Sequence, residues 1–277
     1  MTTDYYANKA LSHSRLSCLA QSPMEFKMRY VDDPPTLPPK ESDAFAFGHA
    51  VHCLALEPEK FDERFAVAPK VDRRTTAGKV AWAEYLADCE GKTVLDEQDH
   101  ADAIACVQAL NNHPEFATIM AQPRRVEVEH QFDLFGHRFK AKPDCIVDSM
   151  KLIVDIKTTD DASPHRWQWS AVDYGYHRQA WIYRGAIELS HANKEPVTES
   201  YRFIFAVVEK PKPSTRGIPP TVALYELDSD TMRMGCEDTL ALVNDYETRL
   251  ETNNWQQPYS SGIVPLRLPK RRVYEGE

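Results

Sequence analysis

Two short stretches of the chain hold acidic and basic residues at a spacing that suits phosphate chemistry. They are Lys142-Pro143-Asp144 and, after ten intervening residues, Asp155-Ile156-Lys157. A turn centred near Ser149 places Asp144 and Asp155 nearly opposite each other in an antiparallel hairpin, with Cβ atoms roughly 4.5–5.5 Å apart. Lys157 lies two residues beyond Asp155, so strand alternation returns it to the same face. The pattern therefore predicts two carboxylates and one ammonium at a single point.

Such a cluster is suited to the hydrolysis of phosphodiesters. Two carboxylates this close repel each other unless a proton or a cation lies between them. Hard oxygen ligands select Mg²⁺ or Mn²⁺, and a neighbouring ammonium can orient or help deprotonate an attacking water and stabilise negative charge on phosphorus. The alternative is a surface hairpin with a salt bridge from Lys157 to an aspartate, because such tripeptides are common. The Pro143-Asp144 pair and the apolar run 152–154 favour the site.

Three motifs together resemble those of RecB-type PD-(D/E)xK nucleases. Pro143-Asp144 with Asp155-Ile156-Lys157 resembles the motif that gives the superfamily its name. Gly48-His49-Ala50-Val51-His52 resembles the G-x-x-x-H helix, and Gln179-Ala180-Trp181-Ile182-Tyr183 resembles the Q-x-x-x-Y helix. Within that superfamily the arrangement is most similar to RecE-type nuclease domains (exodeoxyribonuclease VIII), from the N-terminal helices to beyond Tyr201.

The resemblance implies roles for individual residues. It implies that His52, Asp144, Asp155 and the backbone carbonyl of Ile156 bind Mg²⁺, with Mn²⁺ able to substitute. It also implies that the helix with Gln179 and Tyr183, one turn apart, helps to hold the site and the DNA backbone. For His52 and Tyr183 the alternative is ordinary packing on an amphipathic helix.

Further residues are weaker candidates. His49 is expected to have a structural or supporting role one turn from His52, and Glu129 is a possible extra acid, although a solvated strand residue is the simpler expectation. The others are Thr158 and Thr159 as phosphate contacts, Trp167 and Trp169 as base-stacking or core residues, and the basic tail Lys270-Arg271-Arg272 as a DNA contact or a solvated end.

The secondary-structure elements that must position these residues are predicted to be helical in the first part of the chain and mixed strands and helices in the second. Helical patterns dominate the first part, including a capping box at Ser22-Pro23-Met24-Glu25, a helix from about Ser42 to Leu56, and helices near 77–89 and 97–111. The helix at 97–111 carries its expected apolar stripe on Ala101, Ile104, Val107 and Leu110.

Strand patterns begin after Pro123. A three-strand meander is predicted over 126–132, 138–147 and 151–156, followed by a helix over 173–189, a buried strand over 201–208, a strand near 221–227 and a helix over 230–251. We therefore expect one α/β domain over residues 1–277. It would combine a PD-(D/E)xK core, a central mixed sheet flanked by helices, at 123–254 with a helical N-terminal elaboration at 1–122 and a tail at 255–277.

The composition and charge of the chain exclude several classes of protein. The chain has 277 residues and a formal net charge of -9, which argues mildly against a nucleic-acid-coated protein. The segment 136–184, however, carries eight positive and six negative residues, so it is locally basic. The six cysteines have no zinc or iron–sulfur spacing. No signal peptide, membrane span or P-loop is visible, so we expect a cytoplasmic protein that does not use ATP.

These observations lead to a function hypothesis. The resemblance implies a Mg²⁺-dependent exonuclease that digests linear double-stranded DNA from 5′ ends and leaves 3′ single strands for recombination. It also implies a homo-oligomer, such as a ring-shaped tetramer, and an annealing protein of the RecT type as partner. The alternatives are an endonuclease or a flap- or single-strand-specific nuclease, and a non-catalytic module that binds DNA ends.

Overall fold

A five-stranded mixed sheet forms the centre of the molecule. The structure is a computed structural model that describes residues 8–38, 43–72, 74–192, 200–257, 259 and 262–265. Strands lie in the order β3-β6-β7-β8-β9, and only the β7–β8 pair is parallel. The strands are β3 (Arg125–Val126), β6 (Cys145–Val147), β7 (Leu152–Thr159), β8 (Arg202–Glu209) and β9 (Val222–Glu226).

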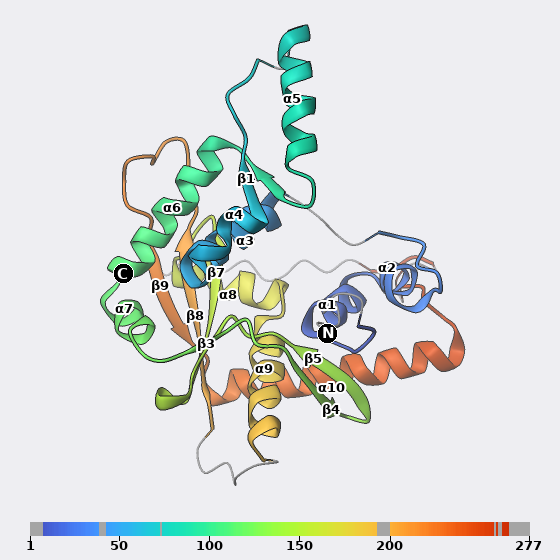
Figure 1. The fold of residues 1–277 in the computed structure, drawn as a ribbon. Helices are drawn as coiled ribbons and strands as arrows, with labels where there is room; N and C mark the ends of the chain where they lie inside the picture. The colour runs from blue at the N-terminus through green and yellow to red at the C-terminus, as the bar shows by residue number, and fades with distance from the viewer. Residues whose placement is uncertain are drawn as a thin grey trace.

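Helices cover both faces of this sheet, as predicted for the PD-(D/E)xK core (Figure 1). Because neighbouring residues of a strand point to opposite faces, Val154 and Ile156 pack toward α3 (Asp43–Leu56) and α6 (Glu97–Asn112). Ile153 packs on the other side with residues of α8 (Pro164–Asp173) and α9 (Tyr176–Ala192). The long α10 (Ser229–Thr252) packs against α9, where a Cβ on Gly235 would lie 2.3 Å from the His177 carbonyl oxygen.

The predicted meander is wrong in one respect, because two of its strands are broken. Residues 126–132 divide into β3 and β4 (His130–Leu134), and 138–147 divide into β5 (His137–Ala141) and β6. Glu127, with φ 52°, interrupts the first strand in a left-handed conformation, and Pro143 lies in the gap within the second, where its ring removes a backbone donor. The hairpin β4–β5 consequently leaves the central sheet and forms its own two-stranded sheet.

This hairpin packs with the N-terminal helices. Phe132 and Phe139 join Leu16 and Leu19 of α1 (His13–Gln21) in one apolar cluster with Ile182 of α9. The capping prediction at Ser22 is confirmed in part. The Ser22 hydroxyl accepts from the Glu25 N–H at the start of α2 (Pro23–Phe26), while the Glu25 carboxylate pairs with Arg29. A π-helical turn follows (Lys27–Val31).

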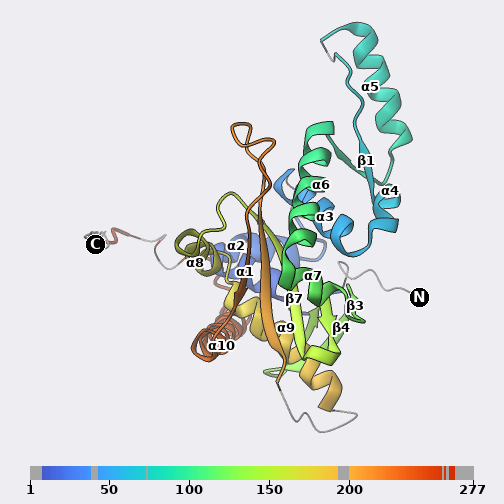
Figure 2. The same cartoon turned by 90° about the vertical axis from the view of Figure 1, so that its left-hand side faces the viewer.

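The segment of the chain between α3 and α6 forms a projecting arm. It leaves the body after α4 (Phe61–Arg64) through β1 (Phe65–Val67), forms α5 (Thr76–Asp88) and returns through β2 (Thr93–Leu95), which pairs in parallel with β1. Figure 2 shows α5 extending away from the rest of the molecule, and no residue of α5 is buried. The Thr75 hydroxyl caps the helix by accepting from the Gly78 N–H, so local interactions rather than packing hold it.

One helical prediction needed correction. The helix α6 lies where expected, but Ala101 and Ile104 of the predicted stripe are exposed, and the buried side comprises Asp102, Ala103, Cys106 and Leu110. The helices α7 (Pro114–Met120) and α8 were not predicted. None of the described helices is long and apolar enough to cross a membrane. Ser42, where the α3 cap was expected, lies outside the described residues.

Candidate functional site

The β6–β7 hairpin brings the two predicted aspartates together. Its register pairs Cys145 with Val154 and Val147 with Leu152. One step further along the same register, Asp144 lies opposite Asp155, as the spacing predicts. Asp155 is fully buried and Asp144 is nearly so. Two carboxylates therefore stand side by side where water is largely excluded.

Asp155 is held by one ammonium and one amide. Its carboxylate lies 2.6 Å from the Lys157 Nζ, and the Gln179 side-chain amide donates to it at 2.7 Å. Lys157 lies on the same face of β7 as Asp155, and α9 supplies Gln179, as the motif spacing predicts. Burial alone would lower the pKa of Lys157, but the Asp155 carboxylate raises it above its ordinary value. Lys157 is thus a fixed positive charge at neutral pH.

Asp144 is connected to His52 through the backbone of Ile156. The Asp144 carboxylate accepts from the Ile156 N–H at 2.8 Å and lies 3.3 Å from the His52 Nδ1. The other ring nitrogen of His52, Nε2, is 2.6 Å from the Ile156 carbonyl oxygen. The helix α3 therefore brings His52 to β7, where His52, Asp144 and the Ile156 carbonyl oxygen are in contact. Asp155, the fourth residue assigned by resemblance as a ligand, lies opposite Asp144, and its carboxylate contacts Lys157 and Gln179.

The contact between His52 and Asp144 requires either a proton or a cation. A carbonyl oxygen accepts only, so the His52 Nε2 must carry a proton in that contact, and a neutral ring then turns the lone pair of Nδ1 toward Asp144. Burial lowers the pKa of His52, which favours this neutral ring. Burial, followed by the charge of Asp155, holds the pKa of Asp144 well above its ordinary value. Two lone-pair donors that face each other at 3.3 Å need a proton or a metal ion between them.

Glu127 is a member of the cluster that the sequence did not reveal. Ligand atoms of His52, Glu127 and Asp144 all lie within 4.8 Å of one another. The Glu127 N–H donates to the Asp144 carbonyl oxygen at 3.1 Å, and its carboxylate pairs with the Lys142 Nζ at 2.6 Å. Because alternate residues of a strand lie on the same face, the sequence predicts the same face for Glu127 and Glu129. The left-handed backbone at Glu127 turns its side chain toward the cluster. Glu129, the predicted extra acid, is exposed instead.

The remaining predicted residues are dispersed around the cluster. Tyr183, one turn beyond Gln179, is half-buried, and its ring lies 6.4 Å from that of Phe203. His49 lies on α3 with an exposed side chain. Trp167 is a core residue and Trp169 is half exposed. Thr159 bonds to the backbone of Asp161, and a Cβ on Gly48 would lie 3.6 Å from the Thr158 hydroxyl. The basic tail 270–272 lies outside the described residues.

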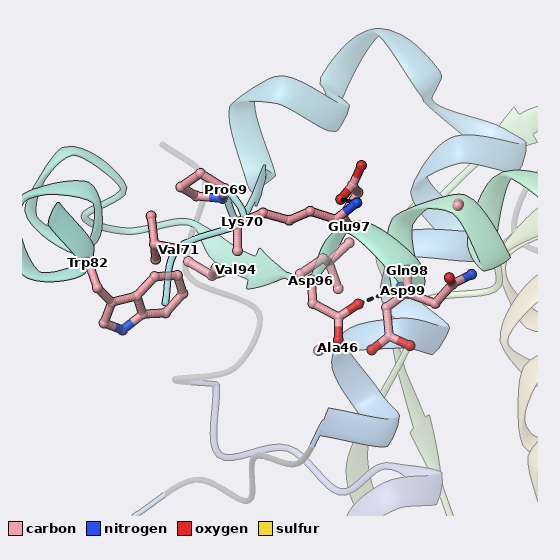
Figure 3. Close-up of a pocket in the computed structure, with 13 residues that line it drawn as sticks. Ala46, Pro69, Lys70, Val71, Trp82, Val94, Asp96, Glu97, Gln98 and Asp99 are labelled. Carbon is pink, nitrogen blue, oxygen red and sulfur yellow. Dashed lines mark hydrogen bonds and ion pairs between the residues drawn. The ribbon is translucent and has the colours of Figure 1, made fainter. Parts of the chain in front are cut away.

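The large cavity drawn in Figure 3 is elsewhere, at the base of the arm. It has a volume of about 730 Å³, and none of the residues of the aspartate cluster lines it. Asp96, Glu97 and Asp99 line it against a single lysine, Lys70, whose Nζ pairs with Glu97 at 2.6 Å. An acidic lining repels phosphate, so this cavity is a poor site for a nucleic-acid backbone.

Comparison with known proteins adds a family and a fold. The profile of a family described as a PDDEXK-like domain of unknown function (DUF3799) matches residues 12–264. No curated protein matches the chain. A solved structure from Eubacterium rectale, provisionally named an exonuclease, is similar with a TM-score of 0.60 and 13% identity, over 97% of this chain and 96% of that one.

Two further solved structures are more distant. An alkaline exonuclease from Laribacter hongkongensis has a TM-score of 0.40 and 12% identity, over 88% of this chain and 91% of that one. A phage-related exonuclease from Haemophilus somnus has a TM-score of 0.35 and 18% identity, over 65% of this chain and 85% of that one.

Proposed function

The chain belongs to the PDDEXK-like family of unknown function (DUF3799), and on this basis we propose that it is a Mg²⁺-dependent DNA exonuclease. The observation that carries the proposal is the set of contacts among His52, Asp144, Asp155 and Lys157, which are four residues from three separate segments. Lys157 compensates the charge of Asp155, whereas the buried Asp144 beside it requires a further proton or cation, which a bound metal ion would provide.

His52, Asp144, Asp155 and the Ile156 carbonyl oxygen are the proposed Mg²⁺ ligands, with Mn²⁺ able to substitute. Glu127 lies close enough to His52 and Asp144 to add a further oxygen. When bound, the ion supplies Lewis-acid activation of the phosphodiester and neutralises the local carboxylates. Mg²⁺ prefers a few carboxylate oxygens together with water and substrate phosphate, and the mixture of donors here fits that preference.

The protein's own groups divide the remaining work. Lys157, protonated and held by Asp155 at 2.6 Å, can orient the attacking water and stabilise the negative charge that develops on phosphorus. Gln179 fixes the orientation of Asp155 through its amide. Tyr183 is proposed, as the resemblance implies, to act from the same helix on the DNA backbone.

The substrate is proposed to be linear double-stranded DNA, digested from 5′ to 3′ to leave 3′ single strands for homologous recombination. Three observations support this choice. The motifs resemble those of RecE-type nucleases, and the similar structure from Eubacterium rectale is provisionally named an exonuclease. The locally basic segment 136–184 within an acidic chain also suits an enzyme that moves along DNA.

The same resemblance supports proposals on assembly. We expect one catalytic domain with the core at 123–254, a ring-shaped homo-oligomer such as a tetramer, and a RecT-type annealing protein that receives the single strands. The proposed place of action is the cytoplasm, where bacterial or phage DNA ends occur.

The test compares DNA topologies and end labels. The purified chain with Mg²⁺ should digest linear duplex and leave covalently closed circles intact, and 5′-labelled ends should be released before 3′-labelled ends. Efficient cleavage of closed circles would replace the exonuclease proposal with the endonuclease alternative. Faster release of 3′ labels would reverse the polarity.

The non-catalytic alternative predicts a different outcome. A module that only binds DNA ends would retain labelled duplex in a gel-shift experiment with Mg²⁺ and release no nucleotides. The intact set of His52, Asp144, Asp155 and Lys157 argues against it, because a binding module has no use for buried paired carboxylates.

A further inference from the structure

The exposed aromatic ring of Tyr174 lies near the active-site lysine, with the ring of Tyr176 between them. The Lys157 Nζ is 5.0 Å from the centre of the Tyr176 ring. The Tyr176 ring stacks in turn on Tyr174, with ring centres 5.6 Å apart and an interplanar angle of 27°. Tyr174 is 56% exposed. Two short steps therefore lead from the ammonium to an aromatic surface open to solvent.

The inner part of this aromatic group is core. Tyr176 also stacks on Trp167 at 5.2 Å, and Trp167 stacks on Tyr225 at 6.0 Å. Trp167 is only 4% exposed and therefore offers no surface to a ligand. Tyr174 differs from it, because Tyr174 stacks on Tyr176 and still presents more than half of its surface to solvent.

The backbone holds Tyr174 in a fixed position. Tyr174 is the C-cap of α8, and its N–H donates to the Ser170 carbonyl oxygen at 3.0 Å. Gly175 then turns the chain with φ 67° into α9, which carries Tyr176 and Gln179. This left-handed conformation favours glycine at position 175. The ring is thus preorganised relative to the active site and loses little conformational freedom on binding.

We propose that Tyr174 is a stacking platform for an unpaired nucleobase of the DNA strand that enters the active site. The inference rests on the proposed nuclease function. An aromatic face accepts any base, because every base has a π face, which suits an enzyme that must digest DNA of any sequence. The substrate form recognised at this position is a frayed or single-stranded end rather than closed duplex.

The experiment measures binding without cleavage, with Ca²⁺ in place of Mg²⁺. Duplexes with short 5′ or 3′ overhangs carry 2-aminopurine at the unpaired terminal position, and blunt duplex serves as reference. Tyr174→Ala should weaken binding of an overhang about 5- to 100-fold and abolish the fluorescence quenching that stacking produces. Tyr174→Phe keeps the ring and should match the wild-type protein in both measurements.

Val172→Ala is the matched control, since Val172 is 58% exposed on the same helix. It should bind and quench as the wild-type protein does. Equal weakening by Tyr174→Ala and Val172→Ala would overturn the platform, as would unchanged binding and quenching in Tyr174→Ala. If the wild-type protein digests DNA while Tyr174→Ala behaves identically, only the platform fails. If the wild-type protein neither binds nor digests any DNA, the proposed function itself fails.

Discussion

Two polar regions of the molecule, the cavity at the base of the arm and the aspartate cluster on β7, differ in their physical properties. The cavity at the base of the arm is large and open, and its acidic residues are satisfied by local contacts, such as the Asp96 carboxylate that accepts from the Asp99 N–H and caps α6. The charged groups of the aspartate cluster on β7 are buried against one another. Buried charges in mutual contact are costly, and functional sites are where proteins maintain them.

The two regions also differ in how the fold supports them. The arm depends on a capped helix without buried residues and a short parallel strand pair. The cluster is fixed by three elements that pack on one another: the β6–β7 hairpin shares one apolar cluster with α3 and another with α9. Substitutions in the cluster should therefore change chemistry, whereas substitutions at the cavity should leave it unchanged.

The largest expected effect comes from Asp155. Asp155→Asn keeps the shape of the side chain but removes the negative charge. That charge pairs with Lys157 and belongs to a proposed metal ligand. We expect hydrolysis of linear duplex to fall by at least about 10³-fold, as for the removal of a central catalytic group. Initial rates of nucleotide release measure this, with Asp133→Asn, an exposed carboxylate on the β4–β5 hairpin, as control. Equal rates for Asp155→Asn and the wild-type protein would place the active site elsewhere.

A smaller effect, on metal affinity, is expected to distinguish Glu127 from Glu129, which the sequence pattern places on the same face of a strand. Glu127→Gln removes a carboxylate within 4.8 Å of the His52 and Asp144 donors, so Mn²⁺ affinity should fall about tenfold. Glu129→Gln alters an exposed residue and should leave the affinity unchanged. Calorimetric titration with Mn²⁺ measures both. If the two variants bind alike, Glu127 has no part in the metal site.

The charge of Asp144 predicts a dependence of stability on pH. A carboxyl whose pKa is raised by folding stabilises the fold below its unfolded pKa, and this stabilisation is lost as the pH rises through the folded pKa. In EDTA, Asp144→Asn should therefore melt a few degrees above the wild-type protein at pH 8, with a smaller difference at pH 5. Calorimetric melting curves measure this difference.

Addition of Mg²⁺ should then stabilise the wild-type protein selectively, because ligand binding to the folded state raises its melting temperature. Two results would show that Asp144 is not a metal-binding carboxyl with a raised pKa. One is a melting difference that is the same at both pH values, and the other is an equal gain with Mg²⁺ in the wild-type protein and Asp144→Asn.

The smallest effect is expected at the cavity. Trp82→Ala removes the indole that lines one side of it, and the rate of duplex digestion should stay within about twofold of the wild-type rate. The same assay as for Asp155→Asn applies. A loss of tenfold or more would make the arm part of the substrate path and would weaken the contrast between the two regions.

The geometry of the cluster could be predicted where it depends on local spacing. Asp144, Asp155 and Lys157 are linked by one hairpin and the alternation of one strand, so their sequence positions determine their relative placement. The contact between His52 and Ile156 spans 104 residues, and the sequence suggested it only through the resemblance to a known family.

Other features lay beyond the sequence patterns for physical reasons. The inward turn of Glu127 depends on a left-handed backbone that glutamate rarely adopts. The helices α7 and α8 begin with Pro114 and Pro164, residues that are typical both of loops and of the first helical position. The buried side of α6 includes Asp102, which pairs with Arg216, so apolar periodicity placed the stripe correctly at Leu110 but not at Ile104.

The most direct test of the central claim is the digestion of end-labelled linear duplex by the wild-type protein and by Lys157→Ala, each with Mg²⁺ and with EDTA. The account predicts nucleotide release only by the wild-type protein in Mg²⁺, because hydrolysis needs both the metal and the fixed ammonium. Undiminished release by Lys157→Ala, or by the wild-type protein in EDTA, would contradict the assignment of this cluster as the hydrolytic centre.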